Sequence, residues 1–422
     1  MHGFPGSIGL ALMCLLLMTG CNKSAGAETD DGGTAPDSPP AGQVDTGSDT
    51  QANAPADSEP GPEPETNTTP VDTVGLFAQL EGPLTFQSRQ YFVGKSPAAY
   101  NASEPAGSLY LLHGLGASGC DFLDRYYPAQ MVLDALARGY LVVLPETAQQ
   151  SGTCRYENDA APFRSGEIWL DSDLAYLDAL HGEAILEAYP ELADAPIFAG
   201  GMSAGGGVAP GFAQSAHRDL FAGVAVFSNN ATAIAGLNPA QPYDVPTFFI
   251  YGENDNTTKD LSMVIDQMET LGVPWAFELN EAQPLTTTAF VTPLGISEAQ
   301  SAVVAEALLA DHRVADADGY LTSGSFDPYG GKVGAPTDPW EEALTDVFPP
   351  TASFREKEAI LDVLRELDGA HFMPSEFNGA ILDFFDASRT GGDLRDDTGQ
   401  PTPCPIDPME DNDDIVLGDA LP

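Results

Sequence analysis

Short apolar runs bounded by turn-forming residues recur through the middle of the chain. Each is four or five residues long, the length of a buried strand, and they cover Ser108–Leu112, Leu141–Leu144, Pro196–Ala199, Gly223–Phe227 and Thr247–Tyr251. Longer segments with apolar residues at helical spacing lie between them. Such alternation is typical of a parallel sheet covered by helices on both faces. We therefore expect an α/β fold with a mostly parallel, doubly wound sheet.

The helical spacing predicts helices over Ala129–Ala137, Asp171–Tyr189, Ala204–His217, Thr258–Leu271, Ser297–Arg313, Phe354–Glu366 and Glu376–Asp386. The alternating segment Leu84–Val93 predicts an antiparallel hairpin at one edge of the sheet. The interval 281–350 combines a helical run, a Gly- and Pro-rich stretch and Trp340. It has two interpretations: a helical insertion that acts as a lid, or surface decoration together with the last strand.

The two ends of the chain differ in composition from the middle. Residues 1–20 contain the apolar run Ile8–Met18, which is too short to span a membrane but suits a cleaved signal peptide. Residues 21–72 are rich in Pro, Gly, Ser, Thr and acidic residues, so they bury too little apolar surface to fold. The acidic segment 389–422 has the same character. We expect a disordered linker, a globular domain over residues 73–388 and a disordered tail.

A cysteine directly follows the first apolar run. The segment Leu17-Met18-Thr19-Gly20-Cys21 resembles the lipobox of bacterial lipoproteins, in which the cysteine is acylated. The resemblance implies an exported protein that is anchored to a membrane through a lipid on Cys21. Asn22 is compatible with the outer membrane. An ordinary secretory peptide that is cut nearby is the alternative, and it would release the protein.

The charge balance limits the partners of this chain. Its 63 acidic and 16 basic residues give a formal net charge of −47. A basic face for nucleic acid or for anionic lipid is therefore not expected. A neutral small-molecule or polymeric substrate is easier to accommodate, and we expect a monomer.

Two cysteines lie inside the predicted globular part. An exported protein can form disulfides, and Cys120 and Cys154 each follow a predicted strand at the same edge of the sheet. We therefore predict a disulfide between them. No spacing of cysteines and histidines matches a zinc site, and we expect neither a metal nor another cofactor.

The segment Gly201-Met202-Ser203-Ala204-Gly205 lies between a predicted strand and a predicted helix. This G-x-S-x-G pattern is typical of a nucleophile elbow, where a sharp turn exposes one side chain and leaves room only for small neighbours. The pattern predicts Ser203 as a nucleophile. Because Gly, Ser and Ala are common residues, the motif needs support from a base and an acid elsewhere.

A serine nucleophile requires a general base and an acid that orients this base. Among the six histidines, His371 stands out because it lies in the segment Gly369-Ala370-His371 of a loop between two predicted helices. Asp255 lies just past the last predicted strand, in Gly252-Glu253-Asn254-Asp255, and Glu253 and Asp260 are alternatives for the acid. The resulting chain order of nucleophile, acid and base is that of α/β-hydrolases.

Together these motifs resemble the α/β-hydrolase fold family over roughly residues 84–388. They are His113-Gly114 after the third strand, the G-x-S-x-G elbow, Tyr-Gly-x-x-Asp after the seventh strand and Gly-Ala-His before the last helix. The resemblance implies an oxyanion hole formed by the backbone N–H groups of Leu115 and Ala204.

The elbow is similar to that of secreted polyhydroxyalkanoate depolymerases and of related feruloyl or acetyl esterases. The loop around His371 looks like that of cutinase-type polyester hydrolases. Both resemblances imply a serine hydrolase that cleaves carboxylic esters through an acyl-enzyme. A serine peptidase with the same triad and a non-catalytic binding lipoprotein are the competing functions.

Two further motifs suggest other ligands. Gly114–Gly119 is a literal G-x-G-x-x-G after a strand, and Glu146 ends the next strand where a ribose-binding acid could lie. This gives a dinucleotide-binding alternative. The segment Asp316-Ala317-Asp318-Gly319 hints at a calcium loop, but the first and twelfth ligand positions of an EF-hand fall on Val314 and Ser325, so we expect only a turn.

Overall fold

The computed structural model describes residues 80–114, 117–147, 169, 171–229, 243–255, 261–326, 337–347 and 354–391. The predicted signal peptide, lipidation site and linker lie outside these residues and stay predictions. The predicted tail also lies outside them from residue 392 on, but its first residues belong to the helix Asn378–Thr390, so the predicted start at 389 is too early. No helix in the part of the chain that is described is long and apolar enough to cross a membrane.

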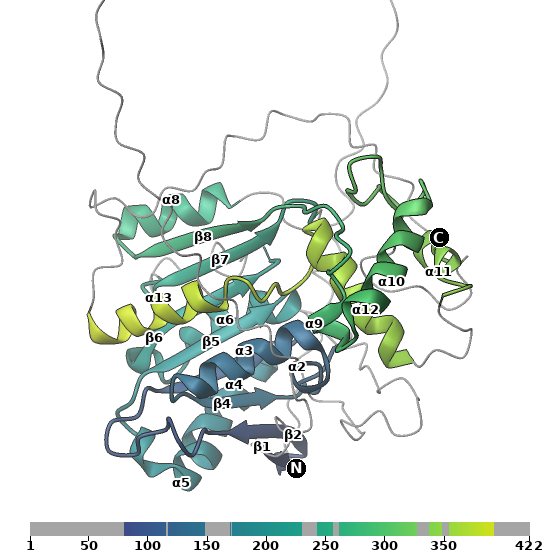
Figure 1. The fold of residues 1–422 in the computed structure, drawn as a ribbon. Coiled ribbons are helices and arrows are strands. Elements are labelled where there is room, and N and C mark those ends of the chain that lie inside the picture. The colour runs from purple at the N-terminus through teal and green to yellow at the C-terminus, as the bar shows by residue number, and fades with distance from the viewer. Residues whose placement is uncertain are drawn as a thin grey trace, which may run out of the picture. The chain divides into compact units, whose positions relative to one another are not determined.

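One eight-stranded sheet organises the described residues, with the strand order β1-β2-β4-β3-β5-β6-β7-β8 (Figure 1). The strands are β1 Leu80–Phe86, β2 Arg89–Gly94, β3 Ser108–Leu112, β4 Leu141–Pro145, β5 Ile197–Met202, β6 Phe221–Phe227, β7 Thr247–Gly252 and β8 Trp275–Asn280. The pairs β1·β2 and β2·β4 are antiparallel, and all other neighbours are parallel. The expected mostly parallel sheet and its antiparallel edge hairpin are confirmed.

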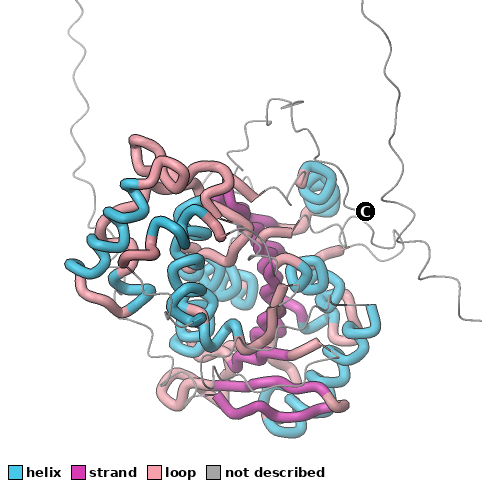
Figure 2. The backbone as a smooth tube through the Cα atoms, turned by 90° about the vertical axis from the view of Figure 1, so that its right-hand side faces the viewer, coloured by secondary structure: helices cyan, strands magenta, loops and turns pink. Residues whose placement is uncertain are grey.

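Helices connect the strands and cover both faces of the sheet (Figure 2). They are α2 Asp121–Asp124, α3 Tyr126–Ala137, α4 Asp171–Ala179, η2 Leu180–Ile185, α5 Leu186–Ala188, η3 Pro190–Leu192, α6 Ala204–Ala213, η4 Arg218–Leu220, α8 Ser262–Leu271, α9 Val291–Leu294, α10 Glu298–Ala310, α11 Pro339–Ala343, α12 Phe354–Asp368 and α13 Asn378–Thr390. Each helix predicted from spacing has a counterpart here, although α6 ends at Ala213 rather than at His217.

Two separate apolar cores show which helices share a face. Tyr176 of α4, Phe212 of α6 and Met268 of α8 pack in one core against the sheet. Met131 of α3 and Phe385 of α13 belong to the other. The sheet is therefore doubly wound, and its parallel strands are buried on both sides, as their nearly continuous apolar sequences require.

The last strand is not where the second interpretation of residues 281–350 placed it. The strand part of that interpretation is wrong, because β8 precedes the interval and pairs in parallel with β7; the choice between a lid and surface decoration stays open. The described part of the interval holds α9, α10 and α11 together with one isolated bridge between Ala315 and Leu321. Spacing missed β8 because Glu278, which is exposed, and Asn280 interrupt its short apolar run at the edge of the sheet.

The inserted helices form a third apolar core of their own. Phe290, Leu308 and Trp340 of this interval pack with Leu364 of α12. The insertion starts where β8 ends and returns through α12, so it lies at the carboxyl edge of the strands (Figure 1). Whether it acts as a lid stays a prediction.

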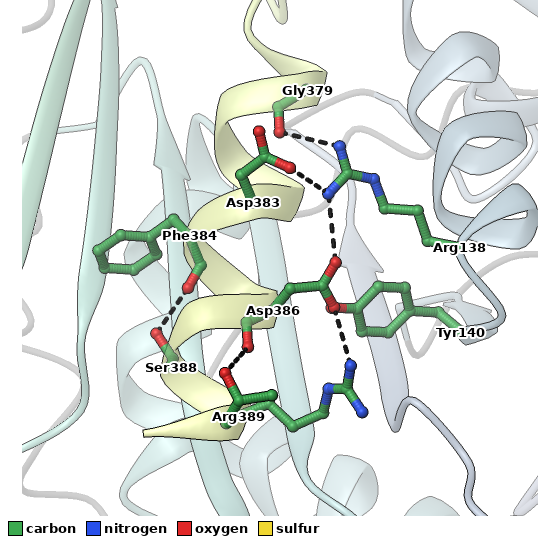
Figure 3. Close-up of polar contacts among 9 residues, drawn as sticks. Arg138, Tyr140, Gly379, Asp383, Phe384, Asp386, Ser388 and Arg389 are labelled. Carbon is green, nitrogen blue, oxygen red and sulfur yellow. Dashed lines mark hydrogen bonds and ion pairs between the residues drawn. The ribbon is translucent and has the colours of Figure 1, made fainter. Parts of the chain in front are cut away.

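Helix α13 is fixed to the sheet by a polar network (Figure 3). Arg138 donates to Asp383 at 2.6 Å, to Asp386 at 3.2 Å and to the carbonyl of Gly379 at 3.2 Å. The hydroxyl of Tyr140 donates to Asp386 at 2.9 Å. These contacts join α13 to the end of α3 and to the start of β4. They therefore hold the helix that follows the loop of His371.

Candidate active site

Ser203 occupies a strained turn between β5 and α6. Its φ of 53° and ψ of −117° lie outside the regions that residues with a side chain prefer. A Cβ on Gly201 would lie 2.2 Å from the carbonyl oxygen of Gly205, and one on Gly205 would lie 2.2 Å from that of Leu112. Both glycines of the motif are therefore required by close backbone packing, as the sequence predicted for an elbow.

Three hydrogen bonds hold the backbone of this turn. The N–H of Ser203 donates to the carbonyl of Phe227 at 2.9 Å. Its own carbonyl accepts from the N–H of Gly207 at 3.1 Å and from the side-chain amide of Asn229 at 2.6 Å. The strained conformation is thus fixed from the end of β6 and from the first turn of α6.

Asp255 and His371 meet although 116 positions separate them. Nδ1 of His371 lies 3.1 Å from both carboxylate oxygens of Asp255. Both residues are buried, with the Asp255 side chain 0% exposed. Because a carboxylate only accepts, Nδ1 carries the proton, and in the neutral imidazole Nε2 keeps a lone pair. A histidine held in this tautomer can accept a proton at Nε2.

The structure places one of the two alternative acids, Glu253, away from His371, and it does not describe the other. Glu253 is exposed, and its Oε2 accepts the N–H of Ala282 at 2.8 Å. Its carboxylate is thus bound to the segment after β8 rather than to His371. Asp260 lies outside the described residues. Among the described candidates, Asp255 is the acid that the fold brings to His371.

The loop of His371 is attached to two strand ends by residues that the sequence did not single out. Asn254 donates its N–H to the carbonyl of Gly369 at 2.9 Å and its side-chain amide to that of Asp368 at 2.8 Å. The hydroxyl of Ser228 donates to the carbonyl of Phe372 at 3.1 Å. Asn254 and Ser228 follow strands, as site residues often do, but no sequence spacing indicates such distant backbone partners.

The end of β6 connects the serine turn with the histidine loop. Phe227 accepts the hydrogen bond from Ser203, and the next residue, Ser228, holds Phe372, which follows His371. The nucleophile candidate, the acid and the base therefore lie at the carboxyl edge of neighbouring strands, in the chain order Ser, Asp, His. This order, the strained elbow after β5 and the mixed eight-stranded sheet together decide the fold. The chain has the α/β-hydrolase fold.

No protein-family model and no curated protein sequence matches this chain. Similar solved structures include a ferulic acid esterase, with a TM-score of 0.34 and 19% identity over 45% of this chain and 83% of that one. A carboxylesterase of Bacillus cereus has a TM-score of 0.31 and 17% identity over 50% of this chain and 91% of that one. Because these TM-scores and identities are low, the fold assignment rests on the strand order and on the elbow.

The predicted oxyanion hole is described in part. A Cβ on Gly114 would lie 3.3 Å from Cβ of Ser203, so the bend after β3 packs directly against the nucleophile candidate. Ala204 begins α6, where backbone N–H groups lack intrahelical partners. Leu115 lies outside the described residues. The roles of Leu115 and Ala204 as donors stay predictions.

Glu146 does not form an open ribose site. The residue is 0% exposed, and a Cβ on Gly119 would lie 3.1 Å from its Oε1. Burial raises the pKa of Glu146 to about 8. The glycine-rich loop thus covers this carboxyl, and the dinucleotide interpretation is wrong because a ribose has no access to it.

The predicted disulfide and the calcium motif are also resolved only in part. Cys120 is disulfide-bonded, but Cys154 lies outside the described residues, so their pairing stays a prediction. Oδ1 of Asp316 accepts the N–H groups of Asp318 at 2.9 Å and of Tyr320 at 3.0 Å, which makes this segment a turn, as expected. Within the described ranges, no group of three or more His, Cys, Asp or Glu could hold a metal ion.

Substitution of Gly252 tests how tightly the acid and base loops pack. A Cβ at this position would lie 1.9 Å from the carbonyl oxygen of Gly369, a backbone atom that cannot move aside alone. We expect Gly252→Ala to destabilise the protein by about 3 kcal/mol and to lower turnover, because overpacking forces backbone shifts. Urea denaturation together with ester kinetics measures both effects.

Gly379→Ala is the matched control for this variant. A Cβ on Gly379, in the first turn of α13, meets nothing within 4 Å. We expect no loss of activity and a stability change between zero and a gain of about 1 kcal/mol from helix propensity. Equal stability and turnover of Gly252→Ala and the wild type would contradict the close packing of the two loops.

Proposed function

We propose that this α/β-hydrolase is a serine hydrolase that cleaves carboxylic esters through an acyl-enzyme. The observation that carries the proposal is the buried pair of Asp255 and His371, held at the same sheet edge as the strained turn of Ser203. This combination supplies a nucleophile, a base in the correct tautomer and a group that orients the base. A structural histidine needs no such arrangement.

The proposed reaction uses each group at a defined step. Oγ of Ser203 attacks the ester carbonyl while Nε2 of His371 takes its proton. Asp255 stabilises the imidazolium that forms, because its carboxylate accepts from Nδ1. The backbone N–H groups of Leu115 and Ala204 hold the oxyanion. His371 then protonates the leaving alcohol, and water attacks the acyl-enzyme with His371 again as the base.

The substrate class follows from the charge and from the insertion. A neutral ester avoids repulsion by the strongly acidic protein. The insertion between β8 and α12 adjoins the loop of His371, because Phe372 packs in the apolar core of the insertion, and we propose that it restricts the size of the substrate as a lid or wall. Polyesters and aryl or acetyl esters fit this proposal. We further propose that the protein is exported and that a lipid on Cys21 anchors it to the outer membrane.

A fluorophosphonate probe and a substrate panel test the proposed function. The full-length protein is labelled, digested and mapped by mass spectrometry, with expected labelling at Ser203. The panel contains nitrophenyl esters of increasing acyl length, a polyester film and a peptide anilide. Ester cleavage without anilide cleavage supports the proposal, whereas anilide cleavage alone would assign a peptidase. If neither labelling nor turnover is observed, the protein is a non-catalytic binding protein.

Fractionation of the expressing cells tests the proposed anchor. The wild-type protein is expected in the membrane fraction of the expressing cells and Cys21→Ser in the soluble fraction. An identical distribution of both proteins would contradict lipidation at Cys21.

A further inference from the structure

Ser228 has the same kind of backbone strain as the nucleophile candidate. In the described part of the chain, positive φ values at residues other than glycine occur at Gln87, Ser88, Ser203 and Ser228. Gln87 and Ser88 form the two-residue turn between β1 and β2, where a tight hairpin favours positive φ. Ser228, with a φ of 49°, instead directly follows β6, a strand that is paired on both sides. Such strain persists only where the surrounding structure imposes it.

We propose that Ser228 is a positioning residue whose hydroxyl holds the backbone after His371 and so sets the place of the base relative to Ser203. The proposal rests on the function proposed above, because it gives His371 the role of the base. The hydroxyl of Ser228 donates to the carbonyl of Phe372 at 3.1 Å. Both residues are 2% exposed, so little water can compete for this bond.

The strained turn explains how the hydroxyl reaches this loop. Along β6, Val226 packs in the core that contains α6, and Phe227 packs in the core that contains α13. Side chains of a strand alternate between the two faces, so an extended Ser228 would point to the face of α6. Its hydroxyl instead bonds Phe372, whose neighbour Met373 packs in the core of α13. The positive φ therefore redirects the hydroxyl from the face of the nucleophile helix to the loop of the base.

The backbone that carries Ser228 is fixed to the nucleophile turn. Met202 pairs with Phe227 in the parallel register of β5 and β6. The next residues of the two strands, Ser203 and Ser228, therefore turn at the same edge of the sheet. The N–H of Ser203 donates to the carbonyl of Phe227 at 2.9 Å, and the N–H of Ser228 donates to β7, to the carbonyl of Ile250, also at 2.9 Å. The hydroxyl of Ser228 thus extends from a backbone that also holds Ser203.

The two sides of His371 in its loop are held differently. Before His371, the carbonyl of Gly369 accepts from the backbone N–H of Asn254 at 2.9 Å. After His371, the side chain of Ser228 supplies the hydrogen bond to Phe372. Without the hydroxyl, the buried carbonyl of Phe372 loses this donor, and its peptide is expected to rotate towards another one. Such a rotation displaces His371, which directly precedes it.

Two substitutions of Ser228 separate the hydroxyl from the strain. Ser228→Ala and Ser228→Gly both lack the donor, but glycine adopts positive φ without steric cost. We expect each variant to lower kcat of the full-length protein for a soluble nitrophenyl ester by about 10- to 10²-fold, as for a catalytic group that is misplaced by about 1 Å. KM should change little, because the loop carries the base. The glycine variant should melt about 2 °C above the alanine variant, because it relieves the strain.

Ser88→Gly is the matched control for the relief of strain. Ser88 has a φ of 66° and is exposed in the hairpin turn at the edge of the sheet. We expect Ser88→Gly to melt no lower than the wild type and to keep its kcat. A purely structural role of Ser228 would make kcat follow stability, so that the glycine variant would keep more activity than the alanine variant. Wild-type kcat in Ser228→Gly would overturn the proposal.

Hydrogen exchange of the peptide 368–377, which contains His371, gives a readout that needs no turnover. We expect faster exchange in Ser228→Ala and Ser228→Gly than in the wild type and Ser88→Gly. Unchanged exchange in both Ser228 variants would also overturn the positioning role. A wild type without ester turnover would instead refute the proposed function, and the exchange data alone would then decide whether Ser228 holds the loop.

Discussion

Replacement of Ser203 by alanine is expected to lower kcat for ester hydrolysis by roughly 10⁴- to 10⁶-fold, with loss of fluorophosphonate labelling. Loss of one member of a catalytic triad removes the covalent route, so only the rate from substrate binding and the oxyanion hole remains. The fold should persist, because the turn is held by backbone bonds to Phe227 and Gly207 rather than by the hydroxyl. Ester kinetics and thermal denaturation of the purified variant measure both quantities.

Ser388→Ala is a suitable control for this substitution. The hydroxyl of Ser388 donates to the carbonyl of Phe384 at 2.8 Å within α13, far along the chain from the elbow (Figure 3). Its removal should leave turnover unchanged. If Ser203→Ala kept the activity of the wild type, another group would be the nucleophile and the proposed mechanism would fail.

Asp255→Asn is expected to lower kcat by about 10⁴-fold, the size known for the equivalent change in a serine protease. An asparagine retains the shape of the carboxylate, but its amide group donates to Nδ1 of His371 and favours the wrong tautomer. Nε2 then carries the proton and cannot accept one from Ser203. The measurement is kcat for a soluble ester, with circular dichroism to show that the fold is intact.

Glu253→Gln is the matched control at the same strand end. Glu253 bonds the N–H of Ala282, and a glutamine oxygen can accept the same bond. Its turnover should equal that of the wild type. Loss of activity in Glu253→Gln, with normal activity in Asp255→Asn, would transfer the role of the acid to Glu253.

The sequence predicted the sheet well wherever a strand is buried on both faces. The third strand, Ser108–Leu112, has the predicted bounds, and the other central strands differ by at most three residues at an end. Strand β8 was missed because an edge strand alternates with polar residues and lacks the continuous apolar run that served as the signal. A continuous apolar run thus reports that a strand is buried on both faces, and it does not detect a strand that pairs at the edge of the sheet.

The candidate site was predictable where the backbone conformation requires a particular residue type, such as glycine. The elbow needs Gly201 and Gly205, and both are visible as letters of a motif. The contacts of Asn254 and Ser228 with the histidine loop were not predictable, because their partners are backbone carbonyls more than 100 positions away. The buried position of Glu146 was likewise misread, since the same glycine pattern can approach a phosphate or a carboxyl.

The packing of Phe372 makes the base sensitive to a part of the fold that the nucleophile does not need. Phe372 directly follows His371, yet its ring belongs to the core of the insertion and lies edge-on to Tyr127 at 5.4 Å, with Arg125 above it. Ser203 depends on the sheet and on α6 instead. Local opening of the insertion core would displace the proton acceptor while the serine stays in place. If the proposed function holds, we therefore expect activity to be lost at a lower temperature than the fold, with the difference set by the packing around Phe372.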